Sequence, residues 1–464
     1  MAGMNIADPS PVRDVVIDPA VIRKHDVLGP RYTSYPTADR FSGAFGEAEL
    51  RRALSARTSR APWSIYMHLP FCDTLCYYCA CNKVITRDHG KSAKYVEYLE
   101  RELALLEPLL GGERRICQLH WGGGTPTFLA REEMRRLVAA VDARFERSAD
   151  FECSIEVDPR RLAAGTLGFL AELGFNRVSI GVQDFDARVQ RAVHRIQSEE
   201  ITRAAIDEAR ASGFRSVNLD LIYGLPKQTV EGFADTLDKV IGLAPDRIAL
   251  YSYAHLPAMF KPQRRIAQAD LPGAESKLQI LTLAIGRLRS AGYVYIGMDH
   301  FAKPGDALAQ AQAQGRLQRN FQGYSTYPEC DMLGLGISAI GKVGPTYYQN
   351  VKTLPEYYAA LDAGRLAVVR GIELTPDDLL RRQLIHALAC NFRVSPASLG
   401  VDLARDFAPE LAELRKLAED GLVELAADEI VVTPKGRLLV RSICMVFDRY
   451  LREKRERATY SKVV

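Results

Sequence analysis

Short runs of apolar and β-branched residues alternate with amphipathic patterns through the first part of the chain. The runs SIYMH, ICQLHW, CSIEV, RVSIGVQ, VNLDLIYG and RIALYSY, which lie between Ser64 and Tyr253, predict six strands. Segments 93–109, 131–147 and 228–242 predict amphipathic helices between them. Successive strand–helix units indicate a parallel sheet with right-handed crossovers, either doubly wound or curled toward a barrel. In both architectures the chemistry gathers where strands end.

Two regions depart from this alternation. Residues 1–55 show no sustained period, and the stretch LGPRYTSYPTADRFSGAF is typical of an extended arm that is either disordered or lies across a site. After about residue 375 the pattern changes to helices, a hairpin LVELAADEIVVT and a final helix from KGRLLVRSICMVFDRYLREKRER. We therefore expect an N-terminal arm over the active site (1–55), a barrel domain (56–375) and a mainly helical, winged-helix-like C-terminal domain (376–464).

The composition is that of an ordinary globular protein, with 464 residues, 47% hydrophobic and 25% charged. No apolar run approaches the roughly eighteen residues of a membrane span. The N-terminal sequence MAGMNIADPSPVRD lacks the apolar core of a secretory signal, so a cytoplasmic protein is expected. A net charge of +4 is too small to indicate nucleic-acid binding by itself. Nine cysteines in a reducing compartment are poorly explained by disulfides.

Four of the cysteines lie in one short stretch, FCDTLCYYCACN, at residues 71–82. The spacing C-x3-C-x2-C-x-C follows the first predicted strand, so Cys72, Cys76, Cys79 and Cys81 are placed on a loop at that strand's end. Structural zinc usually takes two separated ligand pairs, and ferredoxin clusters use a more remote fourth ligand. Three thiolates would leave one iron of a cubane open to a substrate. The spacing leaves open whether Cys81 is the fourth ligand.

The other cysteines are scattered in apolar surroundings and are interpreted as small buried hydrophobic residues. They are Cys117, Cys153, Cys330, Cys390 and Cys444.

The cysteine motif, with the aromatic Tyr78 before its third cysteine, resembles that of the radical S-adenosylmethionine (SAM) superfamily. HWGGGTPTFL resembles the superfamily's glycine-rich stretch, and SIEVDP, VSIGVQDFD, HRIQ and NLDLIYGLP follow in the expected order. Cys81, YTSYPTA, YAHLP, GMDHFA, RNFQGYST and TPKGRLLVRSICMVFD extend the resemblance to the oxygen-independent coproporphyrinogen III oxidases over nearly the whole chain. Tyr78, where Phe also occurs, and Cys330 in TYPECD depart from the pattern.

This resemblance implies a partial (β/α)6 TIM-like barrel and an enzyme of haem biosynthesis. The implied reaction is anaerobic oxidative decarboxylation of two propionates of coproporphyrinogen III to vinyl groups, which gives protoporphyrinogen IX by 5'-deoxyadenosyl radical chemistry. Cys72, Cys76 and Cys79 would hold one 4Fe-4S cluster whose open iron binds SAM, and two SAM molecules would be used per product. A low-potential donor, flavodoxin- or ferredoxin-like, and a monomeric state are also implied.

The resemblance further implies the residues of the site. Tyr66 and Glu156 would be catalytic and, together with Gly123 and Ile340, would contact the cluster-bound SAM. Contacts to a second SAM molecule are implied for Tyr78, Gly124, Thr125, Gln183, Arg195, Asp220 and Ala254.

Several other side chains are expected near the site. His68 and His120 are interpreted as strand residues that line or support it. Because planar guanidinium groups suit carboxylates, we hypothesise that a basic cluster meets the substrate's propionates. Its members are Lys261, Arg264 and Arg265, with the N-terminal Arg31.

Other functions were weighed against this one. GLGISA, from Gly334, satisfies a nucleotide fingerprint, but no clear strand precedes it and Glu356 falls in a helical pattern, which argues against a nicotinamide site. The helix APELAELRKLAEDG carries the wrong charge for a DNA-recognition helix, and the basic tail is interpreted as a solvated helix face. A haem-binding chaperone of the same superfamily and a plain iron–sulfur electron carrier remain alternatives; Cys81 and the arm favour the oxidase over the chaperone.

Overall fold

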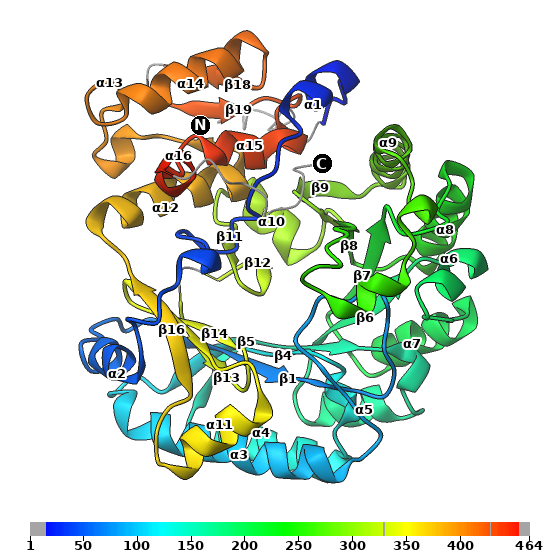
Figure 1. Ribbon diagram of the computed structural model, residues 1–464, viewed down its shortest axis with the longest axis vertical. Helices are drawn as coiled ribbons and strands as arrows, with labels where there is room; N and C mark the ends of the chain where they lie inside the picture. The colour runs from blue at the N-terminus through cyan, green and yellow to red at the C-terminus, as the bar shows by residue number, and fades with distance from the viewer. Residues whose placement is uncertain (1–14, 328–329, 427, 454–464) are drawn as a thin grey trace, which may run out of the picture.

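The six predicted strands form the centre of one parallel sheet. The computed structural model describes residues 15–327, 330–426 and 428–453. Within these ranges the strands pair with their neighbours in chain order, every pair parallel. They are β1 (Trp63–Leu69), β4 (Arg115–Gly123), β5 (Glu146–Val157), β6 (Arg177–Gln183), β7 (Ser216–Tyr223) and β8 (Arg247–Ser252). The sheet curls into the predicted partial barrel (Figure 1).

The sheet continues at both edges with strands that the sequence patterns did not predict. Beside β1 lies the parallel β13 (Asp331–Leu335), followed by antiparallel β14 (Ile340–Val343), β15 (Thr346–Asn350) and β16 (Val368–Glu373). Beside β8 lie antiparallel β10 (His300–Ala302) and β9 (Val294–Gly297). The described part of the sheet therefore has twelve strands.

The expectation that no strand enters GLGISA was wrong, because β13 runs through Gly334. The next element in the chain is the antiparallel strand β14, and α11 (Leu354–Asp362) follows only after β15. The strand-to-helix turn that would hold a dinucleotide therefore does not form here.

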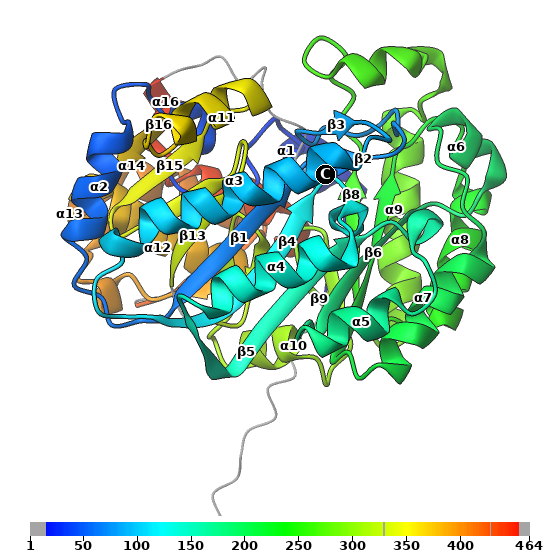
Figure 2. The same ribbon diagram turned by 90° about the horizontal axis from the view of Figure 1, so that it is seen from below.

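The helices between the central strands cover the outer face of the sheet (Figure 2). The predicted helices are α3 (Gly90–Leu106), α4 (Arg131–Asp142) and α8 (Val230–Leu243). The second ends short of the predicted residue 147 because the chain enters β5 at Glu146. Further helices along the barrel are α5 (Thr166–Glu172), α6 (Ala187–Ala192), α7 (Glu199–Ala211), α9 (Ala274–Ser290) and α10 (Ala307–Ala313).

Helix α7 shows why these segments are helical. Ser198 caps its N-terminus by accepting from the backbone of Ile201, and Glu199 and Glu200 complement the helix dipole. Its buried residues recur at helical spacing, so one face packs on the sheet and the other meets solvent. They are Thr202, Ala205, Ile206 and Ala209.

The N-terminal arm contains helices as well as extended chain. α1 (Pro19–His25) and α2 (Glu47–Ser55) interrupt it, the second with Leu50 and Leu54 buried. Between these helices the arm is fastened to the C-terminal domain. The guanidinium of Arg441 donates to the carbonyls of Gly29 and Pro30, and the hydroxyl of Tyr32 donates to Asp448 at 3.0 Å.

The C-terminal region is mainly helical, as predicted. It contains α12 (Pro376–Asn391), α13 (Leu403–Asp406), α14 (Ala408–Glu419), α15 (Val440–Met445) and α16 (Arg449–Glu453). The predicted hairpin is β18 (Val423–Leu425) with β19 (Ile430–Val432), and β17 (Arg393–Val394) joins it. It lies beside α1 at one end of the molecule (Figure 1).

The single long terminal helix was a wrong prediction, because the chain breaks between α15 and α16. The Asp448 carboxylate there accepts from the backbone of Tyr450 and from the Tyr32 hydroxyl. Residues 1–14 and 454–464, on which the expectations of a missing signal and a basic tail partly rest, lie outside the described residues. No helix within the described ranges has both the length and the apolar character needed to span a bilayer.

Candidate functional site

The four clustered cysteines lie on a loop that leaves the C-terminal end of β1. The short parallel strands β2 (Phe71–Cys72) and β3 (Val84–Ile85) close this loop. The backbone of Gly124 donates to the carbonyl of Leu69 at 2.8 Å, which fixes the loop against the end of β4. A Cβ at Gly124 would lie 2.5 Å from the carbonyl carbon of Pro70, so this close approach of two backbones requires glycine.

The thiols line a cavity of about 290 Å³ at the ends of the barrel strands. Cys76 is buried, Cys72 and Cys79 are half-buried, and Cys81 is exposed. Hydroxyl and guanidinium groups face the sulfurs: Thr125 donates to Cys72 Sγ at 3.5 Å, and Arg160 donates to Cys76 Sγ at 3.4 Å. Such donors favour the thiolate, the form in which cysteine binds metal; at Cys72 the Thr125 hydroxyl opposes burial, which raises the pKa of this thiol to about 12.

This donor set fits an iron–sulfur cluster. In the described part of the chain, no group of three or more His, Cys, Asp or Glu side chains is arranged to hold a single metal ion. In a four-iron cluster each cysteine binds a different iron, so its ligands need not converge on one point. Lys83, which donates to the carbonyls of Cys79 and Cys81, places a cation beside the loop.

A buried network of ion pairs at the ends of β5 and β6 contacts the cysteine loop. The Arg195 side chain is buried and donates to Asp158 at 3.2 Å, to the carbonyl of Gly181 at 2.6 Å and to Cys76 Sγ at 3.7 Å. Burial opposes ionisation of Asp158, but the charges of Arg195 and Arg160 outweigh it and lower the pKa of Asp158. The network therefore links β5 and β6 to the cysteine loop through charge-assisted hydrogen bonds.

Two carboxylates face the same cavity. Glu156, near the end of β5, accepts from the backbone of Gly123 at 3.1 Å and pairs with His120 at 3.5 Å. Desolvation opposes its ionisation, but His120 and Gly123 outweigh that effect and lower the pKa of Glu156. Asp220 accepts from the Ser179 hydroxyl at 2.8 Å, and burial, with a contribution from Glu156, raises the pKa of Asp220 to about 6.

The structure brings most of the predicted site residues together on the wall of this cavity. They are Cys72, Cys76, Tyr78, Cys79, Gly123, Gly124, Thr125, Glu156, Gln183, Arg195 and Asp220. Gln183 ends β6 with a positive φ of 70°, which turns the chain at the rim of the barrel.

Three predicted residues do not line the cavity wall. Tyr66 lies one layer behind it, stacked on His120 with 5.8 Å between ring centroids and bonded to His68 at 3.0 Å. Gln263 donates to the carbonyls of both Ala254 and Tyr78, which ties Ala254 to the loop. Ile340, on β14, packs in a separate apolar cluster.

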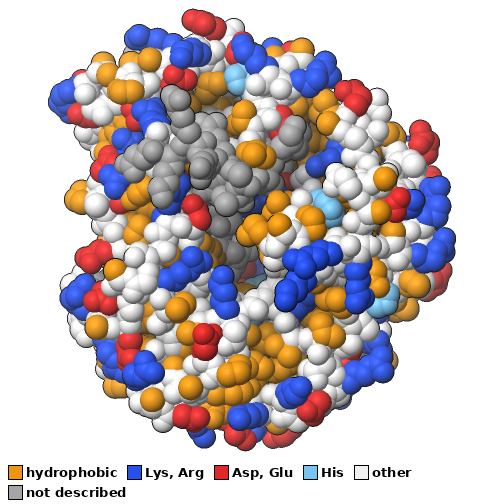
Figure 3. Space-filling view, viewed as in Figure 1, with side chains coloured by type: hydrophobic (Ala, Val, Ile, Leu, Met, Phe, Trp, Pro, Cys, Tyr) orange, Lys and Arg blue, Asp and Glu red, His pale blue; other side chains and the backbone are white. Residues whose placement is uncertain are grey.

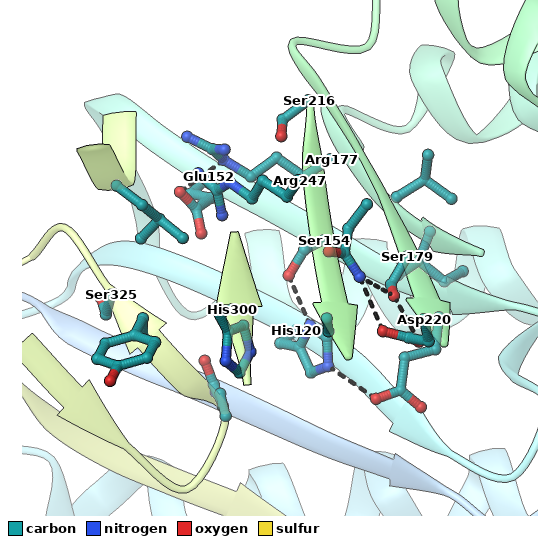
Figure 4. Close-up of a pocket in the computed structure, with 18 of the residues that line it drawn as sticks. His120, Glu152, Ser154, Arg177, Ser179, Ser216, Asp220, Arg247, His300 and Ser325 are labelled. Atoms are coloured by element: carbon teal, nitrogen blue, oxygen red, sulfur yellow. Dashed lines mark hydrogen bonds and ion pairs between the residues drawn. The ribbon is translucent and has the colours of Figure 1, made fainter. Parts of the chain in front are cut away.

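A second cavity, of about 160 Å³, lies deeper in the barrel and shares Glu156, Ser179, Asp220 and Tyr251 with the first. Figure 4 shows its polar lining, including the bond between His120 and Ser154. Sequence reasoning missed this cavity. A signal was available, because inward positions alternate along each strand, as in Glu152, Ser154 and Glu156 of β5.

Two ion pairs close the far end of this cavity. Arg177 pairs with Glu152 at 2.6 Å, and Arg247 pairs with Asp306 at 2.9 Å. The cavity opens toward the hairpin of β11 (Gln318–Asn320) and β12 (Gly323–Ser325), which contributes Asn320, Gln322, Tyr324 and Ser325 to its wall.

The basic residues expected to meet propionates lie elsewhere. Lys261, Arg264 and Arg265 are exposed, and Arg265 lies over the ring of Tyr77 on the outer side of the cysteine loop. None of the three is among the described residues that line either cavity. Arg31 is paired with Asp299, which neutralises it.

The remaining cysteines are mostly buried, as interpreted. Cys117, Cys153, Cys390 and Cys444 are buried, while Cys330 is half-buried and its sulfur lies 3.4 Å from that of Cys117.

On the face seen in Figure 3, acidic and basic side chains are interspersed, with no large area of one charge.

Comparisons with known proteins agree along the whole chain. Residues 66–240 match the family described as "Radical SAM superfamily", and residues 374–439 match the "HemN C-terminal domain". The chain is 50% identical to the oxygen-independent coproporphyrinogen III oxidase of Escherichia coli (strain K12), over 98% of this chain and 100% of that protein. It is 49% identical to the protein of that name from Pseudomonas aeruginosa, over 96% and 98% of the two chains.

The fold is equally similar. The solved structure of the Escherichia coli coproporphyrinogen III oxidase, described as a radical SAM enzyme, superposes with a TM-score of 0.90 at 49% identity. The match covers 95% of this chain and 100% of that one.

Proposed function

Because the chain belongs to the oxygen-independent coproporphyrinogen III oxidase family, we propose how its own residues serve that family's reaction. The chain is a radical SAM oxidoreductase of haem biosynthesis, which converts two propionates of coproporphyrinogen III to vinyl groups and yields protoporphyrinogen IX without oxygen. This conclusion rests on 50% identity over nearly the full length of the chain, together with three clustered thiols that open on a cavity lined by Glu156 and Asp220.

We propose that Cys72, Cys76 and Cys79 hold the 4Fe-4S cluster and that Cys81 is not a ligand. When bound, the cluster and SAM supply the radical that removes a hydrogen atom from a propionate side chain. Arg160 and Arg195 donate to Cys76 Sγ and hold this thiol in place, and Thr125 does the same for Cys72.

The cavity's carboxylates are assigned to SAM. We propose that Tyr66, Gly123, Glu156 and Ile340 contact the cluster-bound SAM; Gly123 and Glu156 lie on the cavity wall, and Tyr66 and Ile340 do not. A second SAM molecule is assigned to Tyr78, Gly124, Thr125, Gln183, Arg195 and Asp220, which line the cavity, and to Ala254, which follows β8 and is tied to the loop by Gln263. Asp220 supports this assignment because its pKa of about 6 leaves it largely ionised near pH 7, able to accept from a hydroxyl or an ammonium group.

The electron donor is proposed to be a low-potential flavodoxin- or ferredoxin-like protein that docks over the cysteine loop. Exposed apolar side chains surround this loop: Ile85 pairs with Cys72 across β2 and β3, and Ile196 follows Arg195. Arg265, which lies over the ring of Tyr77, adds positive charge on the same side, which suits an acidic partner. We further propose that the chain acts as a monomer in the cytoplasm.

The division at residues 55 and 375 is also proposed. It is supported by β16, which ends at Glu373, and α12, which begins at Pro376 after a capping box on Thr375. The arm lies across one side of the barrel, where its Thr33 lines a small cavity with the β11–β12 hairpin.

The test is an anaerobic turnover assay with reconstituted protein, SAM, a chemical reductant and coproporphyrinogen III. Protoporphyrinogen IX should form with wild-type protein and not with Cys76→Ala, which removes a proposed ligand. Tight haem binding without a vinyl product would favour the chaperone. A cluster spectrum that SAM leaves unchanged would favour an electron carrier.

A further inference from the structure

The β11–β12 hairpin carries a buried positive charge, on Arg319, that has no part in the proposed cluster and SAM sites. Arg319, in the RNFQGYST stretch, is 5% exposed. Its Nε and Nη1 atoms are buried without a hydrogen-bond partner, and no described acid lies within ion-pair distance of it. Its guanidinium lies over the ring of Tyr324, 4.7 Å from the centroid. An unpaired buried charge costs several kcal/mol, so its retention indicates a ligand.

The neighbouring arginines differ from Arg319 because each forms an ion pair with an aspartate. Arg31 is paired with Asp299, and Arg247 is paired with Asp306. Burial and, next, the charge of Arg319 lower the pKa of His300 to about 3; Asp299 opposes this shift, and Arg31 and Arg247 add smaller effects. Of these three arginines, Arg319 is the one whose charge no described acid balances.

Arg319 lines a small cavity of about 40 Å³ beside the barrel lumen. The described residues on its wall include Lys342 and His386 and no Asp or Glu. The cavity shares Gln118, Asn320 and Ser325 with the larger lumen cavity, so the two are adjoining parts of one interior. A space of this size holds two or three water molecules, enough for a carboxylate group and far too small for a tetrapyrrole.

We propose that Arg319 binds one carboxylate arm of the substrate and so anchors the tetrapyrrole in the barrel. This inference rests on the proposed function, because it takes coproporphyrinogen III, with its four propionates, as the ligand. Stacking on Tyr324 fixes the plane of the guanidinium, and its unpartnered Nε and Nη1 atoms, on two different edges, leave donors for carboxylate oxygens. Arg319 is thus a binding residue that holds one arm while another reaches the SAM cavity.

The test compares Arg319→Gln and Arg319→Lys with Arg316→Gln in the reconstituted full-length enzyme. Arg316 is exposed and three residues away, and within the described residues its side chain hydrogen-bonds to Gln314 alone, so its replacement is the matched control. Affinity for coproporphyrin III, the fluorescent oxidised form of the substrate, is measured by fluorescence quenching. We expect Kd to rise at least tenfold for Arg319→Gln, to rise for Arg319→Lys, which loses the planar fork, and to stay unchanged for Arg316→Gln.

A stability measurement separates a binding role from a structural one. Arg319→Met removes an unpaired buried charge, so its Tm should equal or exceed that of the wild type while porphyrin affinity falls. Added ethylguanidinium should partly restore porphyrin binding to Arg319→Ala. Wild-type affinity in all Arg319 variants, or a lowered Tm for Arg319→Met without rescue of Arg319→Ala, would overturn the proposal. Failure of wild-type turnover would instead count against the proposed function.

Discussion

Glu102 predicts a pH-dependent stability that can be tested with one substitution. This carboxylate of α3 is 2% exposed and accepts from the backbone of Gly336 at 2.7 Å, from Asn350 at 2.7 Å and from the Tyr357 hydroxyl at 2.6 Å. Burial outweighs these three bonds and raises the pKa of Glu102 from 4.5 to about 7. The carboxyl thus ties the turn after β13 to the helix behind the cysteine loop.

The direction of the pH dependence follows from the linkage between protonation of Glu102 and folding. Between about pH 4.5 and 7 the folded state keeps a proton on Glu102 that the unfolded state has released. The stabilisation of the folded state by this proton is therefore complete below pH 4.5 and is lost as the pH rises through 7. A shift of about 2.5 pKa units corresponds to about 3 kcal/mol. Glu102→Gln resembles the protonated acid at every pH, so the free energy of unfolding of wild type minus variant should fall by about 2.5 kcal/mol between pH 5 and 8, most of the full effect.

Urea denaturation of both proteins at pH 5, 6, 7 and 8 measures this difference, and other titrating groups cancel in it. Glu97→Gln, an exposed position on the same helix, is the control and should give a constant difference. If the wild type and Glu102→Gln also keep a constant difference across this range, Glu102 does not titrate near pH 7 and the reasoning is wrong.

Three further predictions concern the loop and the arm. Cys81→Ser should keep the iron content of the reconstituted protein, measured per chain, because this exposed thiol lies outside the proposed ligand set; iron loss would make it a ligand. Gly124→Ala should lower Tm and abolish SAM binding measured by calorimetry, whereas Gly112→Ala, with open space at its Cβ, should change neither; normal SAM binding by Gly124→Ala would contradict the close packing. Arg441→Gln should speed tryptic cleavage of the arm by removing its bonds to two arm carbonyls, and an unchanged rate would show that other contacts suffice.

The sequence was sufficient for the parts of the fold whose signal is local. The six central strands are long apolar runs, and their parallel pairing follows from the helices between them. The cysteine loop was placed correctly because its motif directly follows β1. The edge strands β10 and β14 were not predicted, since three or four residues carry little periodicity and their strand character depends on the partner beside them.

The polar interior of the barrel could not be predicted from the sequence. Arg247 looks like an exposed strand-end residue until Asp306, far along the chain, is seen to pair with it. Arg319 gave no signal of burial, because its surroundings come from the arm, the sheet edge and α12. The arm's helix α2 was missed for a related reason: a nine-residue segment with two buried leucines is too short to show a sustained period.

The fastening of the arm also sets an order of events during synthesis on the ribosome. The cysteine loop meets its partners early, because Arg195 and Gln263 have left the ribosome well before the C-terminal domain does. The arm's partners Arg441 and Asp448 emerge among the last residues of the chain. While the nascent chain grows, the arm can pair with barrel residues such as Asp299, but it gains its contacts to the C-terminal domain only when translation is nearly complete.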